Sequence, residues 1–137
     1  MVVISIHAIL FPMSTEVTAT VRKYPKLKYD EIKNVVIGKK YNLSLVFIGA
    51  KRAKTLNETY RKKTYTPNIL SFPLDDTNGE IFIAPSVAIK EARKANMSEK
   101  EYTTFLLIHG LLHLKGLGHG DTMDREEKKY MKKLSTK

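Results

Sequence analysis

The stretch SEKEYTTFLLIHGLLHLKGLGH, residues 98–119, combines a helix start signal, a long apolar run and three of the four histidines of the chain. Ser98 and Glu101 form a Ser-x-x-Glu capping box, in which each side chain bonds a free backbone N–H of the first turn. The segment from Phe105 to Leu114 is apolar on nearly every side of a helix, which is typical of a buried helix. Gly116 is a typical stop signal. The sequence therefore predicts a buried helix from residue 98 to about residue 115.

The remaining patterns place shorter strands and helices around this helix. Four β-rich runs predict strands at 2–10, 41–48, 68–74 and 80–84. Pro73 places the third strand at a sheet edge, and Asn78-Gly79 predicts a tight turn into the fourth. Helical spacing and end signals predict helices at 15–24, 30–37, 50–62, 85–95 and 121–134. We therefore expect residues 1–137 to form a single domain of the α+β class, a mixed sheet of about four strands with packed helices.

The composition limits the kind of site that the chain can carry and the place where it acts. With 137 residues and 42% apolar side chains, the chain suffices for one core. It has no cysteine, so a tight transition-metal site must use histidine and carboxylate. The apolar start lacks a basic leader, and no run reaches the roughly 18 apolar residues of a membrane span. We expect a cytoplasmic protein with no membrane partner.

The charge is strongly positive and unevenly distributed. Lys and Arg number 24 against 14 Asp and Glu, a formal net charge of +10. Residues 51–63 hold six bases and one acid, whereas residues 64–105 hold four bases and six acids. Such a basic patch favours a polyanionic partner, most commonly nucleic acid, although an excess of lysine can also serve solubility alone.

The three clustered histidines have the spacing of a metal site. His109 and His113 are four residues apart, so both project from the same side of the predicted central helix. Gly116 allows the chain to turn back, which brings His119 toward the other two. Three imidazoles with a fourth position open to water form a known catalytic zinc arrangement, in which that water can lose a proton near pH 7. The sequence therefore predicts a metal site with ligands at 109, 113 and 119, which suits zinc but also nickel, copper or iron.

The same spacing also occurs in one class of zinc metallopeptidases. Those enzymes place a glutamate directly after the first histidine, where it acts as the general base. Position 110 of this chain is glycine. A metallopeptidase or another zinc hydrolase is therefore the weaker of the two enzyme hypotheses.

The chain resembles the bacterial YbeY endoribonucleases, which act in ribosomal RNA maturation and ribosome quality control. Their signature His-Gly-x-Leu-His-Leu-x-Gly-x-Asp-His is similar to HGLLHLKGLGH at 109–119. Their segments Leu-Asn-x-x-Tyr-Arg, Asn-Val-Leu-Ser-Phe-Pro and Gly-Asp-Ile resemble LNETYR at 56–61, NILSFP at 68–73 and GEI at 79–81. Two positions depart from the family pattern. Gly118 stands in place of an aspartate, for which Asp121 could substitute, and Thr66-Pro67 reverses the usual Pro-Thr.

The resemblance implies a zinc-dependent hydrolase that cuts single-stranded RNA. It implies that His109, His113 and His119 bind one Zn²⁺ per chain and that Arg61 is the functional arginine near the metal. The planar guanidinium of an arginine suits a phosphate whose charge grows during cleavage. We expect rRNA or a ribosomal subunit as the partner, no DNA partner and a monomeric protein. A basic, ribosome-associated factor with a structural metal is the remaining alternative.

Overall fold

Four strands form one mixed sheet at the centre of the protein. The computed structural model describes residues 15–135. The strands are β1 (Thr15–Ala19), β2 (Asn42–Phe47), β3 (Ile69–Asp75) and β4 (Asn78–Ile83). Their order in the sheet is β1-β2-β4-β3, with β1, β2 and β4 parallel and β3 antiparallel to β4. The predicted α+β class with a mixed sheet is confirmed.

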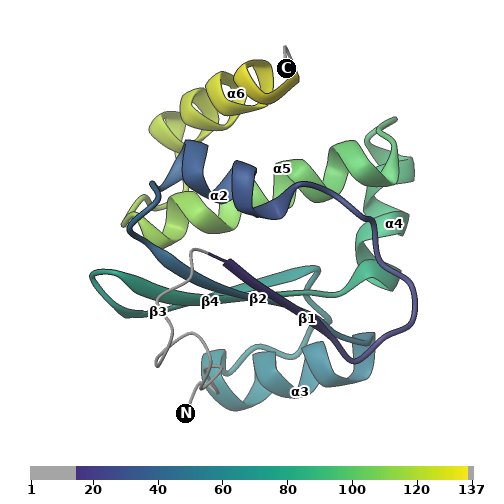
Figure 1. Ribbon diagram of the computed structural model, residues 1–137. Coiled ribbons are helices and arrows are strands. Elements are labelled where there is room, and N and C mark those ends of the chain that lie inside the picture. Colours follow the sequence, from purple (N-terminus) through teal and green to yellow (C-terminus); the bar gives the residue numbers. More distant parts are fainter. Residues whose placement is uncertain (1–14, 136–137) are drawn as a thin grey trace.

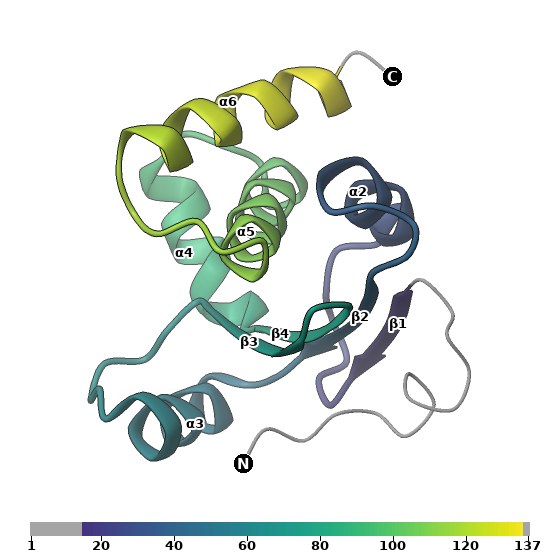
Figure 2. The same ribbon diagram turned by 90° about the vertical axis from the view of Figure 1, so that its left-hand side faces the viewer.

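Helices cover both faces of this sheet, but unequally. They are α2 (Tyr29–Val36), α3 (Ala50–Arg61), α4 (Pro85–Lys94), α5 (Glu99–Leu114) and α6 (Asp121–Ser135). Figure 1 shows α2 and α5 on one face of the sheet with α6 across them, whereas α3 lies beneath the opposite face. Figure 2 looks along α5, which lies between the sheet and α6. No helix in residues 15–135 is both long and apolar enough to cross a membrane.

The alternation of side chains along the strands divides the core in two. Leu43, Leu45 and Phe47 of β2 are fully buried in the larger cluster, on the side of α2, α5 and α6. Val46 belongs to the smaller cluster, which includes Ala53 of α3. Because α5 lies against the sheet and three helices, its apolar side chains are enclosed all round, as its sequence predicts.

Both end signals of α5 are present in the structure. The Ser98 hydroxyl accepts from the backbone N–H of Glu101, and the Glu101 carboxylate accepts from the backbone N–H of Ser98, each at 3.0 Å. Gly116 has φ of +100°, a conformation that residues with side chains rarely adopt. The Leu117 N–H bonds the carbonyl of Leu112 at 3.1 Å, which closes the helix end. The chain then turns back toward α6.

The helix predicted at 15–24 is wrong, because the chain forms strand β1 there. The segment TEVTA is rich in β-branched residues, and its Val17 packs on the main core. Parallel pairing with β2 supplies the backbone hydrogen bonds that a short helix would otherwise make. The strand predicted at 2–10 lies outside the described residues.

The hairpin between β3 and β4 forms, but its turn is not the predicted Asn78-Gly79 pair. The connection is Asp76-Thr77, and Asn78 already pairs with Asn42 of β2. The Asp75 carboxylate accepts from the Thr77 N–H at 2.9 Å and so stabilises the turn two residues earlier. Strand β3 is a sheet edge, as Pro73 indicates.

Candidate metal centre

The structure brings the three clustered histidines together at the end of α5. One ligand atom from each of His109, His113 and His119 lies within 4.8 Å of the others. The ring centroids are 4.5 Å apart for His109 and His113, 5.3 Å for His109 and His119, and 4.7 Å for His113 and His119. The first two rings are half-buried, and His119 is exposed. Together the three imidazoles could hold a metal ion.

Hydrogen bonds fix the orientation of the two helical imidazoles. Nδ1 of His109 contacts the carboxylate of Glu127, which comes from α6 and is buried. Nδ1 of His113 lies 2.8 Å from the carbonyl oxygen of Leu117, which can only accept a hydrogen bond. Each Nδ1 therefore carries a proton, so in the neutral rings both Nε2 atoms present lone pairs.

These two Nε2 atoms face each other across 3.0 Å. Two lone pairs at this distance repel unless a proton or a cation lies between them. Two nitrogens that share a tetrahedral zinc at 2.0–2.1 Å are about 3.3 Å apart, so the observed separation is close to that of a ligand pair. The donor set thus fits a small divalent metal.

Burial and neighbouring imidazoles favour the neutral form of His113. Burial lowers its pKa most, and the rings of His109 and His119 lower it further, against the opposing effects of the bond to Leu117 and the charge of Glu127. Metal binding requires an unprotonated ring nitrogen. The site therefore holds His113 in the protonation state that a metal ligand needs.

A polar cleft opens in front of the three histidines. Its volume is about 310 Å³, and its lining includes the histidines, Arg61, Tyr65 and residues 67–71. In Figure 2, α3 and α5 lie on opposite sides of the sheet, and the chain from α3 to β3 passes along the β3 edge. The cleft is therefore built by the edge strand together with segments from both sides of the sheet.

Arg61 enters this cleft from the last turn of α3. Its guanidinium donates to the side-chain oxygen of Asn57 at 3.5 Å and to the hydroxyl of Tyr65 at 3.3 Å. Asn57 is fully buried, and its amide also donates to the carbonyl of Tyr65 at 3.0 Å. Lys62 reverses the chain with φ of +58°. A buried asparagine thus holds both the arginine and the loop that follows it.

Gly110 does not face the cleft, because it packs against the sheet. A Cβ at this position would lie 2.8 Å from the Ser71 hydroxyl, 2.9 Å from Ile69 and 3.0 Å from Ile81. The Ser71 hydroxyl also donates to the carbonyl of Gly110 at 3.3 Å. Position 110 therefore supplies no acid or base to the site, which disfavours a metallopeptidase mechanism.

The sequence did not identify Glu127 and Asn57 as residues of the site. Glu127, rather than Asp121, is the carboxylate that contacts a site histidine, and Asp121 is exposed at the start of α6. A signal for Glu127 exists, since it interrupts a buried stripe of Met123 and Tyr130 at helical spacing. Asn57 occurs in the LNETYR segment, but its burial could not be predicted from that segment.

The fold and the site together define an α+β protein whose central helix and the turn after it bring three histidines, which could hold a metal ion, to the lining of an open cleft. The family model of Endoribonuclease YbeY matches residues 12–137. The chain therefore belongs to the YbeY family.

Curated relatives and a solved structure agree with this assignment. The Endoribonuclease YbeY of Finegoldia magna is 39% identical over 92 residues, which cover 62% of this chain and 60% of the relative. That of Mesoplasma florum is 34% identical over 111 residues, covering 73% and 62%. The chain spans 60–63% of the length of these relatives and of the one from Alkaliphilus metalliredigens.

The fold is similar to the solution structure of TM1509 from Thermotoga maritima. The TM-score is 0.60 at 24% sequence identity, and the match covers 85% of this chain and 86% of the other. This likeness supports the arrangement of strands and helices described above.

Proposed function

We propose that this protein is a zinc-dependent endoribonuclease that hydrolyses phosphodiester bonds in single-stranded RNA. The observation that carries the proposal is the convergence of two oriented imidazoles, a third histidine and an arginine on one cleft. The family name supports the reaction class. We further propose that the protein acts as a cytoplasmic monomer in ribosomal RNA maturation and ribosome quality control.

His109, His113 and His119 would hold the metal. A divalent ion in such a site acts as a Lewis acid and makes a water acidic enough to serve as a nucleophile near neutral pH. The three imidazoles are neutral ligands, so none of them would cancel the charge of the ion. Glu127 and the Leu117 carbonyl hold the rings of His109 and His113 in place throughout.

Arg61 would bind the scissile phosphate. Hydrolysis joins the oxygen of a water to phosphorus and breaks one phosphorus–oxygen bond to ribose, and a proton of that water ends on the leaving oxygen. Negative charge accumulates on the phosphate oxygens before the bond breaks. The guanidinium donates to Asn57 and Tyr65 through Nη1 and would use its other N–H groups to bind those oxygens.

The alternatives make different predictions for a cleavage assay. Purified protein with one equivalent of zinc should cut a labelled single-stranded RNA, should fail after treatment with a chelator, and should not cut a peptide library. A basic factor with a structural metal would bind RNA under both conditions and cut it under neither. No RNA cleavage by the zinc-loaded protein would contradict the proposal.

The arginine is tested by Arg61→Ala against Arg52→Ala, which removes the same charge from the exposed face of the same helix. We expect Arg61→Ala to lower kcat/KM by about 100-fold or more, since one donor to a developing oxyanion contributes roughly this much. Zinc content and melting temperature should be unchanged in both variants. Equal cleavage rates for the two variants would remove Arg61 from the mechanism.

A further inference from the structure

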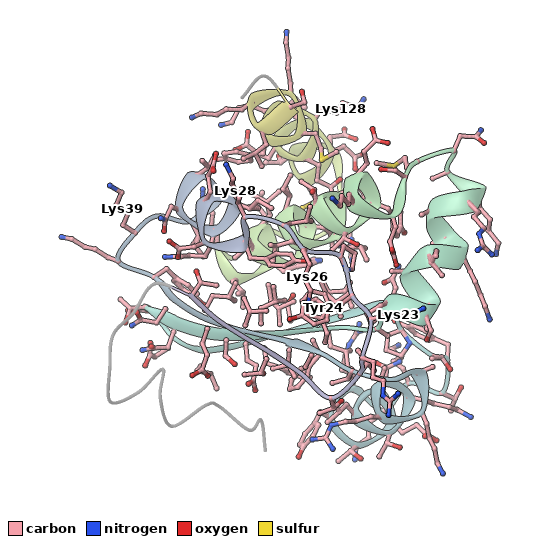
Figure 3. The ribbon with its side chains drawn as sticks, turned by 45° about the vertical axis from the view of Figure 1, so that its right-hand side comes forward. Lys23, Tyr24, Lys26, Lys28, Lys39 and Lys128 are labelled. Carbon is pink, nitrogen blue, oxygen red and sulfur yellow. The ribbon has the colours of Figure 1, made fainter. Side chains whose placement is uncertain are left out.

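A second group of cations lies at the edge of the sheet opposite the metal centre. Figure 3 shows Lys23, Lys26 and Lys28 on the connection from β1 to α2 and Lys39 beyond the far end of α2. All four side chains are exposed. We call these four residues the basic face. Among residues 15–135, β1 and the cleft strand β3 are the two outer strands of the sheet, so the basic face and the cleft lie on different sides of this part of the molecule.

The connection that carries three of these lysines is anchored firmly. Tyr24 stacks on Phe47 of β2 with ring centroids 4.4 Å apart and planes 15° from parallel. The Tyr29 hydroxyl donates to the carbonyl of Pro25, and Leu27 packs on the main core. Residues 20–28 contain four bases and no acid, and every base among them is exposed. The apolar side chains thus anchor the segment while its cations face solvent.

Contacts within the fold also hold Lys26 and the turn from α2 to β2 that carries Lys39. The ammonium of Lys26 lies 3.4 Å from the centroid of the Tyr24 ring, which itself rests on Phe47. The buried ammonium of Lys33 donates to the carbonyls of Gly38, Lys39 and Tyr41 at 3.0, 3.3 and 2.7 Å. The turn that presents Lys39 is therefore bound to the body of α2. Such preorganisation lowers the entropy cost of binding an extended polyanion.

The acid nearest to these lysines in sequence is engaged within the fold. The carboxylate of Asp30 accepts from the Thr15 hydroxyl at 2.6 Å and from the Asn34 amide at 3.3 Å. Glu31 lines a groove together with Lys28 and Lys100. Cations therefore dominate the outward side of the connection.

We propose that the basic face is a second RNA-binding surface, which holds the backbone of a long RNA while a single-stranded part of that RNA lies in the cleft. This inference rests on the proposed function. A membrane surface fits less well, because the large apolar side chains exposed among residues 15–135 are Tyr60, Tyr65 and Leu74, none of which lies on the basic face. Spaced lysines whose apolar neighbours Tyr24 and Leu27 pack inward on the core suit contacts to successive phosphates.

The separation of the two surfaces sets the length of RNA that can use both. A chain of this length has a radius of gyration of about 14 Å, which for a sphere means a radius of about 18 Å and half a circumference of about 57 Å. Five stacked nucleotides extend only about 17 Å at 3.4 Å each. A five-nucleotide substrate can occupy the cleft alone, whereas an RNA of about 40 nucleotides can reach both surfaces.

The test is the triple variant Lys23→Gln, Lys26→Gln, Lys28→Gln in the full-length protein. Its control is Lys90→Gln, Arg93→Gln, Lys94→Gln, which removes the same charge from exposed positions on α4. Affinity for a 40-nucleotide stem-loop with a single-stranded tail is measured with chelator present, between 50 and 200 mM salt. We expect the basic-face variant to bind about tenfold more weakly at 150 mM salt and to have a salt slope lower by about 2 to 3.

Cleavage of a five-nucleotide RNA by the zinc-loaded proteins separates this inference from the proposed function. The basic-face variant should cut the short RNA at the wild-type rate and should show a raised KM only for the long RNA. A charge-preserving variant, Lys23→Arg, Lys26→Arg, Lys28→Arg, should restore long-RNA binding, which shows that the fold is intact.

Three results would overturn the inference. They are equal long-RNA affinity in the basic-face and α4 variants, a KM effect of the same size on the short RNA, and binding of the basic face to anionic vesicles in preference to RNA. Because the binding arm uses chelator, it remains decisive even if the wild-type protein cuts no RNA.

Discussion

At the scale of single residues, Glu127 is the side chain that orients His109 within the three-histidine cluster. Its side chain is only 9% exposed, and it contacts Nδ1 of His109, whereas His113 is held by a backbone carbonyl. A carboxylate in this place fixes the tautomer, holds the ring and increases the basicity of the opposite nitrogen. The family pattern has an aspartate where this chain has Gly118. Among residues 15–135, the acidic side chain that contacts a site histidine is that of Glu127.

Glu127→Gln should weaken zinc binding by about 10- to 100-fold while leaving the fold intact. The neutral amide keeps the shape of the side chain but removes the charge that favours a protonated Nδ1. Competition with a chromogenic chelator measures the affinity. Glu126→Gln is the matched control, because that carboxylate points away and bonds Lys129 at 3.2 Å. Identical zinc affinities in the two variants would assign Glu127 a purely structural role.

At the scale of elements, the sheet carries an unusual polar row on the face toward α3. Glu16, Ser44 and Glu80 are aligned in register across β1, β2 and β4. Glu80 is 2% exposed, and its Oε2 accepts from the Ser44 hydroxyl at 3.0 Å, whereas its Oε1 has no hydrogen-bond partner among the described residues. Burial raises the pKa of Glu80 to about 7, and the charge of Glu16 adds to the effect.

This pKa makes stability depend on pH in a defined window. The folded protein holds the proton of Glu80 up to about pH 7, whereas the unfolded chain releases it near the ordinary value of 4.5. Between these values the native state binds more protons, so the free energy of unfolding falls as the pH rises, by at most about 3 kcal/mol. Urea unfolding from pH 4.5 to 8 measures the slope.

Glu80→Gln should flatten the curve over this window, since the amide stays neutral throughout. Glu58→Gln on the exposed side of α3 should keep the wild-type slope. If Glu80→Gln and Glu58→Gln follow the same curve, the carboxyl of Glu80 is already ionised in the folded protein at low pH.

The elements also show what the sequence could and could not predict. The capping box at Ser98, the stop at Gly116 and the apolar run between them are local signals, and the structure reproduces all three. Residues 15–19 were misassigned because a five-residue strand depends on pairing with β2, which lies more than 20 residues away in the chain. The contact of Glu127 with His109 depends on how α6 crosses α5, and no local pattern encodes that crossing.

At the scale of the whole molecule, one helix carries both a part of the core and two of the three clustered histidines. The fully buried Ile108, Leu111 and Leu112 of α5 lie beside His109 and His113 in the same two turns. The third ligand follows on the turn toward α6, and Glu127 comes from α6 itself. A metal bound by these residues would join α5 to the segment after it and would bind the folded chain in preference to the unfolded one.

Zinc should therefore stabilise the fold. Free zinc at 100 times its dissociation constant adds about 2.7 kcal/mol to the free energy of unfolding, which corresponds to a rise in Tm of roughly 8 °C for a chain of this size. Thermal scans with zinc, with chelator and with magnesium measure the effect. His113→Ala should abolish the response to zinc, and an unchanged response in that variant would contradict the assigned ligands.

Gly110 and Gly118 differ in whether their surroundings leave room for a side chain. At Gly110 the sheet leaves no room for a Cβ, whereas at Gly118 a Cβ would meet no atom within 4 Å. Position 110 therefore cannot take a larger residue without disturbing the contact between α5 and the sheet, whereas position 118, beside His119, can. Over evolution, side chains at such open positions could be lost or gained one at a time, so that relatives with the same scaffold would come to differ in rate and in choice of RNA.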